Sequence, residues 1–396
     1  IDRRFIIIMK QKQKSFLTVP LVALITLVFL LGTSEFIVVG ILPELSDAFH
    51  ISLAKASGIV SLFAFTYAAG TPFLTAFSGR FPRFQITLGF VSVFIITSFL
   101  CVVVNRYPLF LLFRMVNAVL CGTLFSLSMA YASEISTPEN QPKAIAAVFL
   151  GTSIASVLGM PLATAVSQLI GWRGSFILIG GVTCVVLLIM YRTLPKNGSE
   201  TSMGLLHQFV ILKDARIICG VLSVMFISAG VYTVYTYLSP IFSDELRIPA
   251  EFLSPALVGY GLMAVLSNMF SGKLAERRGM ESMPVIFFLQ AVCLAVMPIA
   301  VSKSISGFLC VYALGLLMYL VNSPSQMLFM NVAKKDYPGC VNLASSFSPV
   351  FYNFGIAIGS SLGGILVNHL GLRFVSIGGS VMSAAAILCC LFFRKK

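Results

Sequence analysis

Long apolar runs separated by short polar breaks fill the chain from about residue 16 to its end. A helix needs about 20 apolar residues to cross a hydrocarbon layer of about 30 Å. Membrane strands would be shorter and would alternate strictly, which these runs do not. The pattern therefore predicts an all-α polytopic membrane protein with twelve transmembrane helices, at 16–41, 54–77, 84–104, 108–133, 143–169, 174–194, 216–242, 254–272, 282–302, 305–331, 341–368 and 373–393.

The longest polar break, from Leu194 to Lys213, divides the runs into six and six. Because Met9 is a natural start, we give residues 1–8 no structural role and expect them to be an upstream extension. The predicted segments are a tail over 1–15, a first six-helix bundle over 16–194, a linker over 195–215, a second six-helix bundle over 216–393 and a tail over 394–396.

The two halves repeat each other at an offset of 200 residues. Gly171 and Arg173 stand between the fifth and sixth runs, and Gly371 and Arg373 stand at the matching place between the eleventh and twelfth. Two six-helix halves of the same orientation are a known plan of membrane transporters, in which the substrate site lies at the midplane between the halves.

Basic residues set the expected orientation. The chain has a net charge of +13, with 27 Lys and Arg, and these residues lie between the runs and at the ends rather than on one face. With the N-terminus in the cytoplasm, 20 of them fall inside, six fall outside, and Arg114 lies within a run. This asymmetry predicts a multi-pass protein of the inner (plasma) membrane with both termini cytoplasmic, and it explains the charge without nucleic acid.

Glu35 and Arg114 are the acidic and the basic residue that lie well inside the runs. A charge at such depth costs about 2.5–3.5 kcal/mol on insertion scales, so it is usually functional. Each is six residues from the outer end of its helix, which places both about 9 Å deep at 1.5 Å per residue. We interpret them as a proton-coupling pair in direct contact, and the alternative is a static salt bridge or a water-facing cap at the outer edge.

Four stretches combine glycines with polar or charged residues at the ends of the runs: Gly32 to Pro43, Gly70 to Arg83, Gly159 to Arg173 and Gly272 to Gly279. They resemble motifs of the major facilitator superfamily, and more narrowly of its drug:proton antiporter branch, near the arabinose-efflux-like and purine-efflux-like exporters. The resemblance implies two six-helix bundles and a secondary transporter that needs no cofactor and uses the proton gradient. Departures from the family pattern occur at Ala118, Cys121, Glu276 and Met280.

The resemblance also implies a central cavity lined by the first, fourth, seventh and tenth helices. Five polar residues on these helices are the expected substrate contacts, and ordinary hydrogen bonds between helices are the alternative: Asn117, Tyr232, Tyr235, Asn322 and Gln326. Charges between paired helices are the expected inner gate, with simple retention of basic loops inside as the alternative: Arg80, Arg83, Glu276, Arg277 and Arg278. Gly151, Gly159 and Pro161 match the antiporter motif of the fifth helix.

The leading hypothesis is proton-coupled efflux of a small organic solute or drug by alternating access. The alternative is a proton-coupled importer or a facilitator for a small metabolite such as a sugar, a nucleobase or an amino acid. An enzyme is disfavoured because the three His residues are far apart in sequence and no metal motif occurs. The nine Cys are scattered and predict neither disulfides nor metal ligands. We expect a monomer whose partners are the solute, protons and the lipid bilayer.

Overall fold

The computed structural model describes residues 18–78, 81–137, 141–196, 211–277, 279–337 and 340–394. The first half contains α2 (Val19–Gly40), α3 (Leu42–Ala48), α4 (Leu53–Ser78), α5 (Arg83–Val103), α6 (Tyr107–Glu134), α7 (Gln141–Ile170) and α8 (Trp172–Thr193). The second half contains α9 (Ala215–Tyr235), α10 (Leu238–Pro240), α11 (Ala250–Arg277), α12 (Met283–Ala300), α13 (Ser304–Leu317), α14 (Asn322–Asp336), α15 (Val341–Leu370) and α16 (Val375–Arg394).

Twelve helical segments within the described residues are long and apolar enough to cross a membrane. They fall at the twelve expected places, so the predicted fold class is confirmed. Lipid offers no hydrogen-bond partners, and a helix satisfies its own backbone, which is why apolar runs of this length are helical. An even number of spans returns the chain to its starting face. We call the face where α2 begins and α16 ends the terminal face, and the opposite face the distal face.

Two spans differ from their expected form. The seventh run was expected to be helical to residue 242, but α9 ends at Tyr235 and is followed by the short α10 and a π-helical turn at Ile241–Glu245. Pro240 favours this interruption, because proline lacks the N–H that a continuing helix requires. The tenth run is divided into α13 and α14 by a four-residue break.

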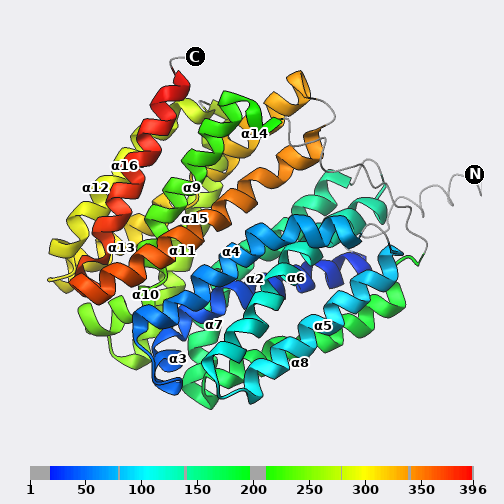
Figure 1. Cartoon of the computed structure of the whole chain (residues 1–396), viewed down its shortest axis with the longest axis horizontal. Coiled ribbons are helices and arrows are strands. Elements are labelled where there is room, and N and C mark those ends of the chain that lie inside the picture. The colour runs from blue at the N-terminus through cyan, green and yellow to red at the C-terminus, as the bar shows by residue number, and fades with distance from the viewer. Residues whose placement is uncertain are drawn as a thin grey trace, which may run out of the picture.

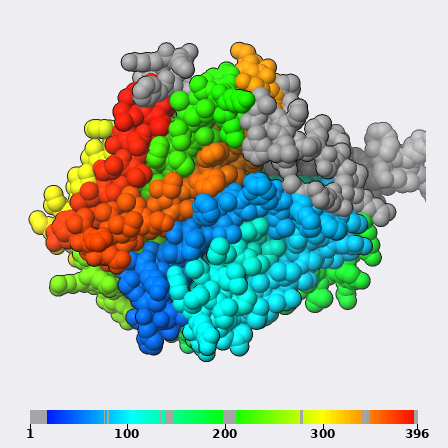
Figure 2. Space-filling model, in the orientation of Figure 1, coloured from blue at the N-terminus to red at the C-terminus, as the bar shows by residue number. Residues whose placement is uncertain are grey.

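The halves form two bundles that meet along two helix pairs, α4 with α15 and α7 with α11. Figure 1 shows α4 and α15 lying side by side across the middle of the molecule. In the space-filling view of Figure 2, α15 in orange lies directly on α4 in blue along a diagonal seam. Within the first bundle α2 packs mainly on α7, and in the second α9 packs on α15 and α16.

Contacts between the bundles close the distal side. Gln168 of α7 donates to the carbonyl of Ala250 at the start of α11 over 2.7 Å. Gly364 of α15 approaches α4 so closely that a Cβ atom there would lie 2.9 Å from the Ser57 hydroxyl and 3.1 Å from the Ala54 carbonyl. These contacts show that α15 and α4 approach closely at position 364, as is usual where membrane helices pack tightly.

The repeat seen in the sequence recurs in the loops at the distal face. Gly171 and Gly371 have φ angles of 80° and 86°, in the left-handed region where glycine is favoured. Two residues later, the Arg173 guanidinium donates to the carbonyl of Val102, and that of Arg373 donates to the carbonyl of Pro298, each over 2.8 Å.

An aromatic cluster secures the distal end of the first bundle. Trp172 at the start of α8 packs on Phe49 and Phe110, with ring centroids 5.7 Å away in both cases. Phe176 packs on the same indole, and the Arg173 guanidinium lies 4.3 Å from its ring centre. Phe49 directly follows α3, so this cluster joins that short helix to α6 and α8.

Candidate functional site

Glu35 lies on α2 at the seam between the bundles. Its side chain is half-buried and lines a small cavity together with Phe63 of α4, Tyr232 of α9 and Ile356 of α15. The cavity measures about 10 Å³, which is close to the minimum for one water molecule. Since both bundles contribute to its walls, the Glu35 carboxylate is placed where movement of one bundle against the other changes its surroundings.

Arg114 of α6 is buried, but its partner is not the Glu35 carboxylate. The guanidinium donates to the Ser34 hydroxyl over 2.9 Å and to the Ser34 carbonyl over 2.7 Å, and it lies 4.4 Å from the centre of the Phe63 ring. Among the described residues no carboxylate forms an ion pair with it.

The expected direct contact between Glu35 and Arg114 is therefore corrected. Successive side chains on a helix point about 100° apart, so Arg114 meets the face of α2 that carries Ser34, while Glu35 faces the seam. Arg114 therefore binds the residue next to Glu35 in the sequence and forms no ion pair with Glu35 itself.

Five tyrosines of the second bundle gather beside Glu35. The Tyr232 ring is 4.9 Å from Tyr235 and 5.9 Å from Tyr352. Tyr235 packs on Tyr260 at 5.7 Å, and Tyr319 is stacked on Tyr352 at 5.9 Å. We call these five residues the tyrosine cluster. Across the seam, Phe36 of α2 lies 6.2 Å from Tyr235.

Three hydroxyls of the tyrosine cluster are buried without a hydrogen-bond partner in the described part of the chain: those of Tyr232, Tyr235 and Tyr352. Buried polar groups normally have a partner, so an unpaired set points to water or ligand atoms at this place. The sequence interpretation named Tyr232 and Tyr235 but missed the other three tyrosines. In the sequence each of the three is a tyrosine inside an apolar run. Only the fold brings α11, α15 and the break between α13 and α14 together.

The other expected cavity residues are distributed differently. Asn117 is fully buried, and its amide oxygen accepts from the Thr97 hydroxyl of α5, inside the first bundle rather than at the seam. Asn322 and Gln326 are half-buried and lie on the first two turns of α14, directly after the break in the tenth span.

The expected inner-gate residues are described only in part. Arg83 at the start of α5 pairs with Glu134 at the end of α6 over 2.7 Å, so this ion pair joins two helices of the first bundle. Arg80 and Arg278 lie outside the described residues. Glu276 and Arg277 end α11, and only their backbone is described.

The antiporter-motif residues bring α7 close to α2. A Cβ atom at Gly151 would lie 2.6 Å from the carbonyl of Ile25, and one at Gly159 would lie 3.2 Å from the Thr33 Cα. The Pro161 carbonyl instead accepts from the Ser254 hydroxyl of the second bundle over 3.1 Å.

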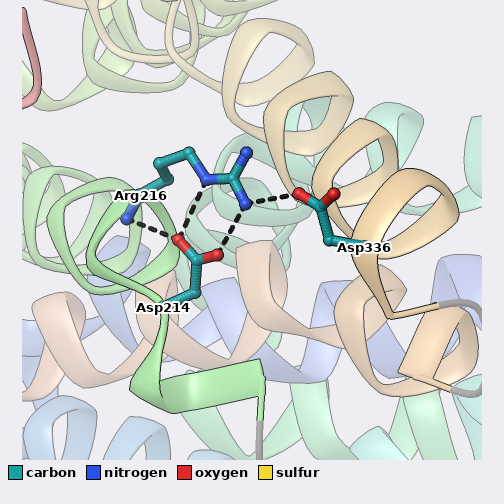
Figure 3. Close-up of polar contacts among 3 residues, drawn as sticks. All are labelled: Asp214, Arg216 and Asp336. Atoms are coloured by element: carbon teal, nitrogen blue, oxygen red, sulfur yellow. Dashed lines mark hydrogen bonds and ion pairs between the residues drawn. The ribbon is translucent and has the colours of Figure 1, made fainter. Parts of the chain in front are cut away.

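A separate ionic cluster lies at the terminal face of the second bundle (Figure 3). Arg216, near the start of α9, donates to Asp214 over 3.0 and 2.7 Å and to Asp336, the last residue of α14, over 2.5 Å. Hydrogen bonds from the Arg216 side chain lower the pKa of Asp214 below its ordinary value. The cluster therefore ties the terminal ends of α9 and α14.

Comparison with known proteins identifies relatives over nearly the whole chain. The sequence model described as Major Facilitator Superfamily matches residues 24–345. An uncharacterised MFS-type transporter of Bacillus subtilis, YtbD, is 29% identical over 372 residues, which is 93% of each chain. The inner membrane transport protein YdhP of Escherichia coli K12 is 26% identical over 95% of this chain and 96% of its own. A probable sugar efflux transporter of Helicobacter acinonychis is 26% identical over 91% of both chains.

Solved structures agree in fold. A bacterial homologue of the human lysosomal transporter Spinster, in an inward-facing and occupied conformation, superposes with a TM-score of 0.79 at 14% identity, covering 95% of this chain and 96% of the other. A D-xylose–proton symporter superposes with a TM-score of 0.74 at 15% identity, again covering 95% and 96%.

Proposed function

The chain belongs to the Major Facilitator Superfamily of membrane transporters, and we propose that it exports a small organic solute across the plasma membrane in exchange for protons. The family works without a bound cofactor, and in this proposal the proton gradient supplies the energy. The partners are the solute, protons and the bilayer, and the transporter acts as a monomer. With both termini in the cytoplasm, the terminal face is cytoplasmic and the distal face is external.

The position of Glu35 is the observation that carries the proposal. It is a carboxylate within the apolar spans, it lines a cavity walled by both bundles, and the tyrosine cluster lies beside it. Burying an ionised carboxylate is costly, so the closed seam favours protonated Glu35, whereas a hydrated seam tolerates the charge. The free energy of proton binding to Glu35 therefore differs between the closed and the hydrated state. Such a difference is the condition for the proton to drive a transition between them.

Arg114 contributes from behind the seam. Its guanidinium is held on Ser34 of the same helix turn as Glu35, and it lies 4.4 Å from the centre of the Phe63 ring and 5.7 Å from that of Phe176. Arg114 adds a fixed positive charge near Glu35 but forms no salt bridge with it. Ionised Glu35 is favoured by this charge, while burial opposes it, so the carboxyl can exchange its proton during the cycle.

The experiment measures proton movement in everted membrane vesicles that contain the protein. Respiration acidifies the vesicle interior, and a pH-sensitive dye reports proton loss when L-arabinose, inosine or tetraphenylphosphonium is added outside. An exporter takes up the solute in exchange for internal protons, so the gradient falls. A proton-coupled importer does not release internal protons when solute is added outside, and a facilitator moves solute without any pH change.

Glu35→Gln mimics the protonated carboxyl and should reduce solute-induced proton release by about tenfold or more, given the free energy associated with a charge inside the membrane. Solute exchange in the absence of a gradient should persist. Asp47→Asn, at an exposed carboxylate of α3, is the matched control and should behave as wild type. If Glu35→Gln still concentrates solute in response to the gradient, Glu35 is not the proton site.

A further inference from the structure

The tenth span is one apolar stretch of 33 residues, Ser304–Asp336, yet it is two helices. Between α13 and α14, residues 318–321 form turns whose remaining bonds are stretched: Leu320 N–H reaches the Leu317 carbonyl only at 3.5 Å. Pro324 accounts for the break, because its ring excludes a helical bond to the carbonyl of Leu320 four residues earlier. A break inside a membrane leaves N–H groups that lipid cannot satisfy.

The hydroxyls of two serines in α11 accept hydrogen bonds from two backbone N–H groups at the break. Tyr319 N–H donates to the Ser267 hydroxyl over 2.9 Å, and Ser323 N–H donates to the Ser271 hydroxyl over 2.8 Å. Both serines are fully buried. They are four residues apart, as are the two amides, so one turn of α11 matches one turn of the broken span.

Close packing makes these bonds possible. A Cβ atom at Gly315, near the end of α13, would lie 3.1 Å from the Tyr260 ring and 3.2 Å from the Met263 Cβ, so α13 approaches α11 closely here. At its other end α14 is tied to α9 by the Arg216–Asp336 pair (Figure 3). The half-helix α14 is therefore held by polar contacts at both ends.

The break fixes the position of one member of the tyrosine cluster and of the start of α14. Tyr319 lies within the break and stacks on Tyr352, and Asn322 and Gln326 follow on the first two turns of α14. Continuous helix through residues 318–321 would rotate and shift these side chains together. We propose that Ser267 and Ser271 are positioning residues: they hold the tenth span broken at this level and thereby set where Tyr319, Asn322 and Gln326 stand in the transport site.

The test begins with amide hydrogen exchange, which needs no substrate. In wild-type protein in lipid nanodiscs, the peptide covering residues 315–325 should exchange slowly. Ser267→Ala should speed exchange of the Tyr319 amide, and Ser271→Ala that of Ser323, each by about tenfold or more, as expected for loss of one buried hydrogen bond. Ser223→Ala is the matched control, since Ser223 is a fully buried serine of α9 whose hydroxyl has no partner in the described chain.

A second measurement separates positioning from mere stability, and it rests on the proposed function. For whichever of L-arabinose, inosine or tetraphenylphosphonium the wild type transports, Ser267→Ala should raise KM at least fivefold with a smaller change in maximal rate, and Ser223→Ala should not. Unchanged exchange in residues 315–325, or fast exchange with unchanged KM, overturns the inference. If the wild type moves none of the three solutes, the proposed function fails for these probes, while the exchange data still decide whether the serines hold the break.

Discussion

At the scale of single residues, Glu44 is the carboxylate outside the spans whose surroundings are most unusual. It lies on α3 near the distal face, where one oxygen accepts from the Ser167 hydroxyl over 3.4 Å. The other oxygen is buried without a partner in the described residues. Burial raises the pKa of Glu44 above its ordinary value of 4.5, although its hydrogen bonds to its own backbone and to Ser167 act in the opposite direction.

This raised pKa predicts a pH-dependent stability. The folded protein holds the Glu44 proton to higher pH than the unfolded chain does, so its stabilising contribution is complete below about pH 4.5 and is lost as pH rises through the folded-state pKa. The melting temperature of Glu44→Gln should therefore exceed that of wild type at pH 8 by on the order of 1–2 °C. At pH 4 the two proteins should melt at the same temperature. Thermal unfolding across this range is the measurement, with Glu251→Gln, at an exposed carboxylate of α11, as control. A difference that is constant with pH would count against the assignment.

Glu35 and Arg114 show what residue counting predicts and what it misses. Distance from the helix ends correctly indicated that the two residues lie at similar depth, because rise per residue is fixed. It did not reveal that Arg114 binds Ser34, because the rotation of α6 about its axis is set by packing against Phe63 and Phe176. The same limit explains Asn117, which faces Thr97 of α5 rather than the seam.

At the scale of helices, the twelve spans could be predicted from the apolar runs of the sequence, because membrane spans must be long, apolar and helical. The interruption of the tenth span was also visible in principle as Pro324, but its stabilisation was not. Ser267 and Ser271 look like any buried serines in the sequence, and only the neighbouring helix shows what they bind. The packing of α2 on α7 was better signalled, since Gly151 and Gly159 are small residues in an apolar run.

The α2–α7 contact gives a prediction with an internal control. A Cβ atom at Gly151 would lie 2.6 Å from the Ile25 carbonyl, whereas one at Gly181 of α8 would meet nothing within 4 Å. Gly151→Ala should therefore destabilise the protein by about 1–3 kcal/mol, the usual cost of overpacking. Gly181→Ala should be neutral or slightly stabilising, because alanine favours the helix. Denaturation of the two variants in the same detergent tests this, and equal stabilities would contradict the close contact.

At the scale of the whole molecule, the two bundles meet at the distal face through α4 with α15 and α7 with α11. Transport by alternating access requires these contacts to separate and re-form. The internal repeat supports relative movement of two similar bodies, since each carries its own arginine-braced loop at Arg173 and Arg373. The sequence predicted this plan through its offset of 200 residues, but not which helices form the seam.

A reversible cross-link at the seam tests the need for this separation. In the Ser57→Cys and Gly364→Cys double variant, the two positions are close enough for a disulfide, since a Cβ atom at 364 would lie 2.9 Å from the Ser57 hydroxyl oxygen. Oxidation should reduce transport in vesicles by about tenfold or more, and reduction should restore it. Each single variant treated in the same way is the control. Full transport by the cross-linked protein would show that the distal seam need not open.

Trp172 is the single tryptophan of the chain, and it is 6% exposed. One side of its indole rests on Phe49, the residue that follows α3, and the other residues around it belong to α6 and α8. Emission from an indole moves to longer wavelength when water reaches it. Any displacement of α3 from the distal end of the first bundle wets this one fluorophore, while the second bundle contributes no tryptophan signal. The unlabelled wild-type protein therefore carries its own optical reporter for events at its distal face.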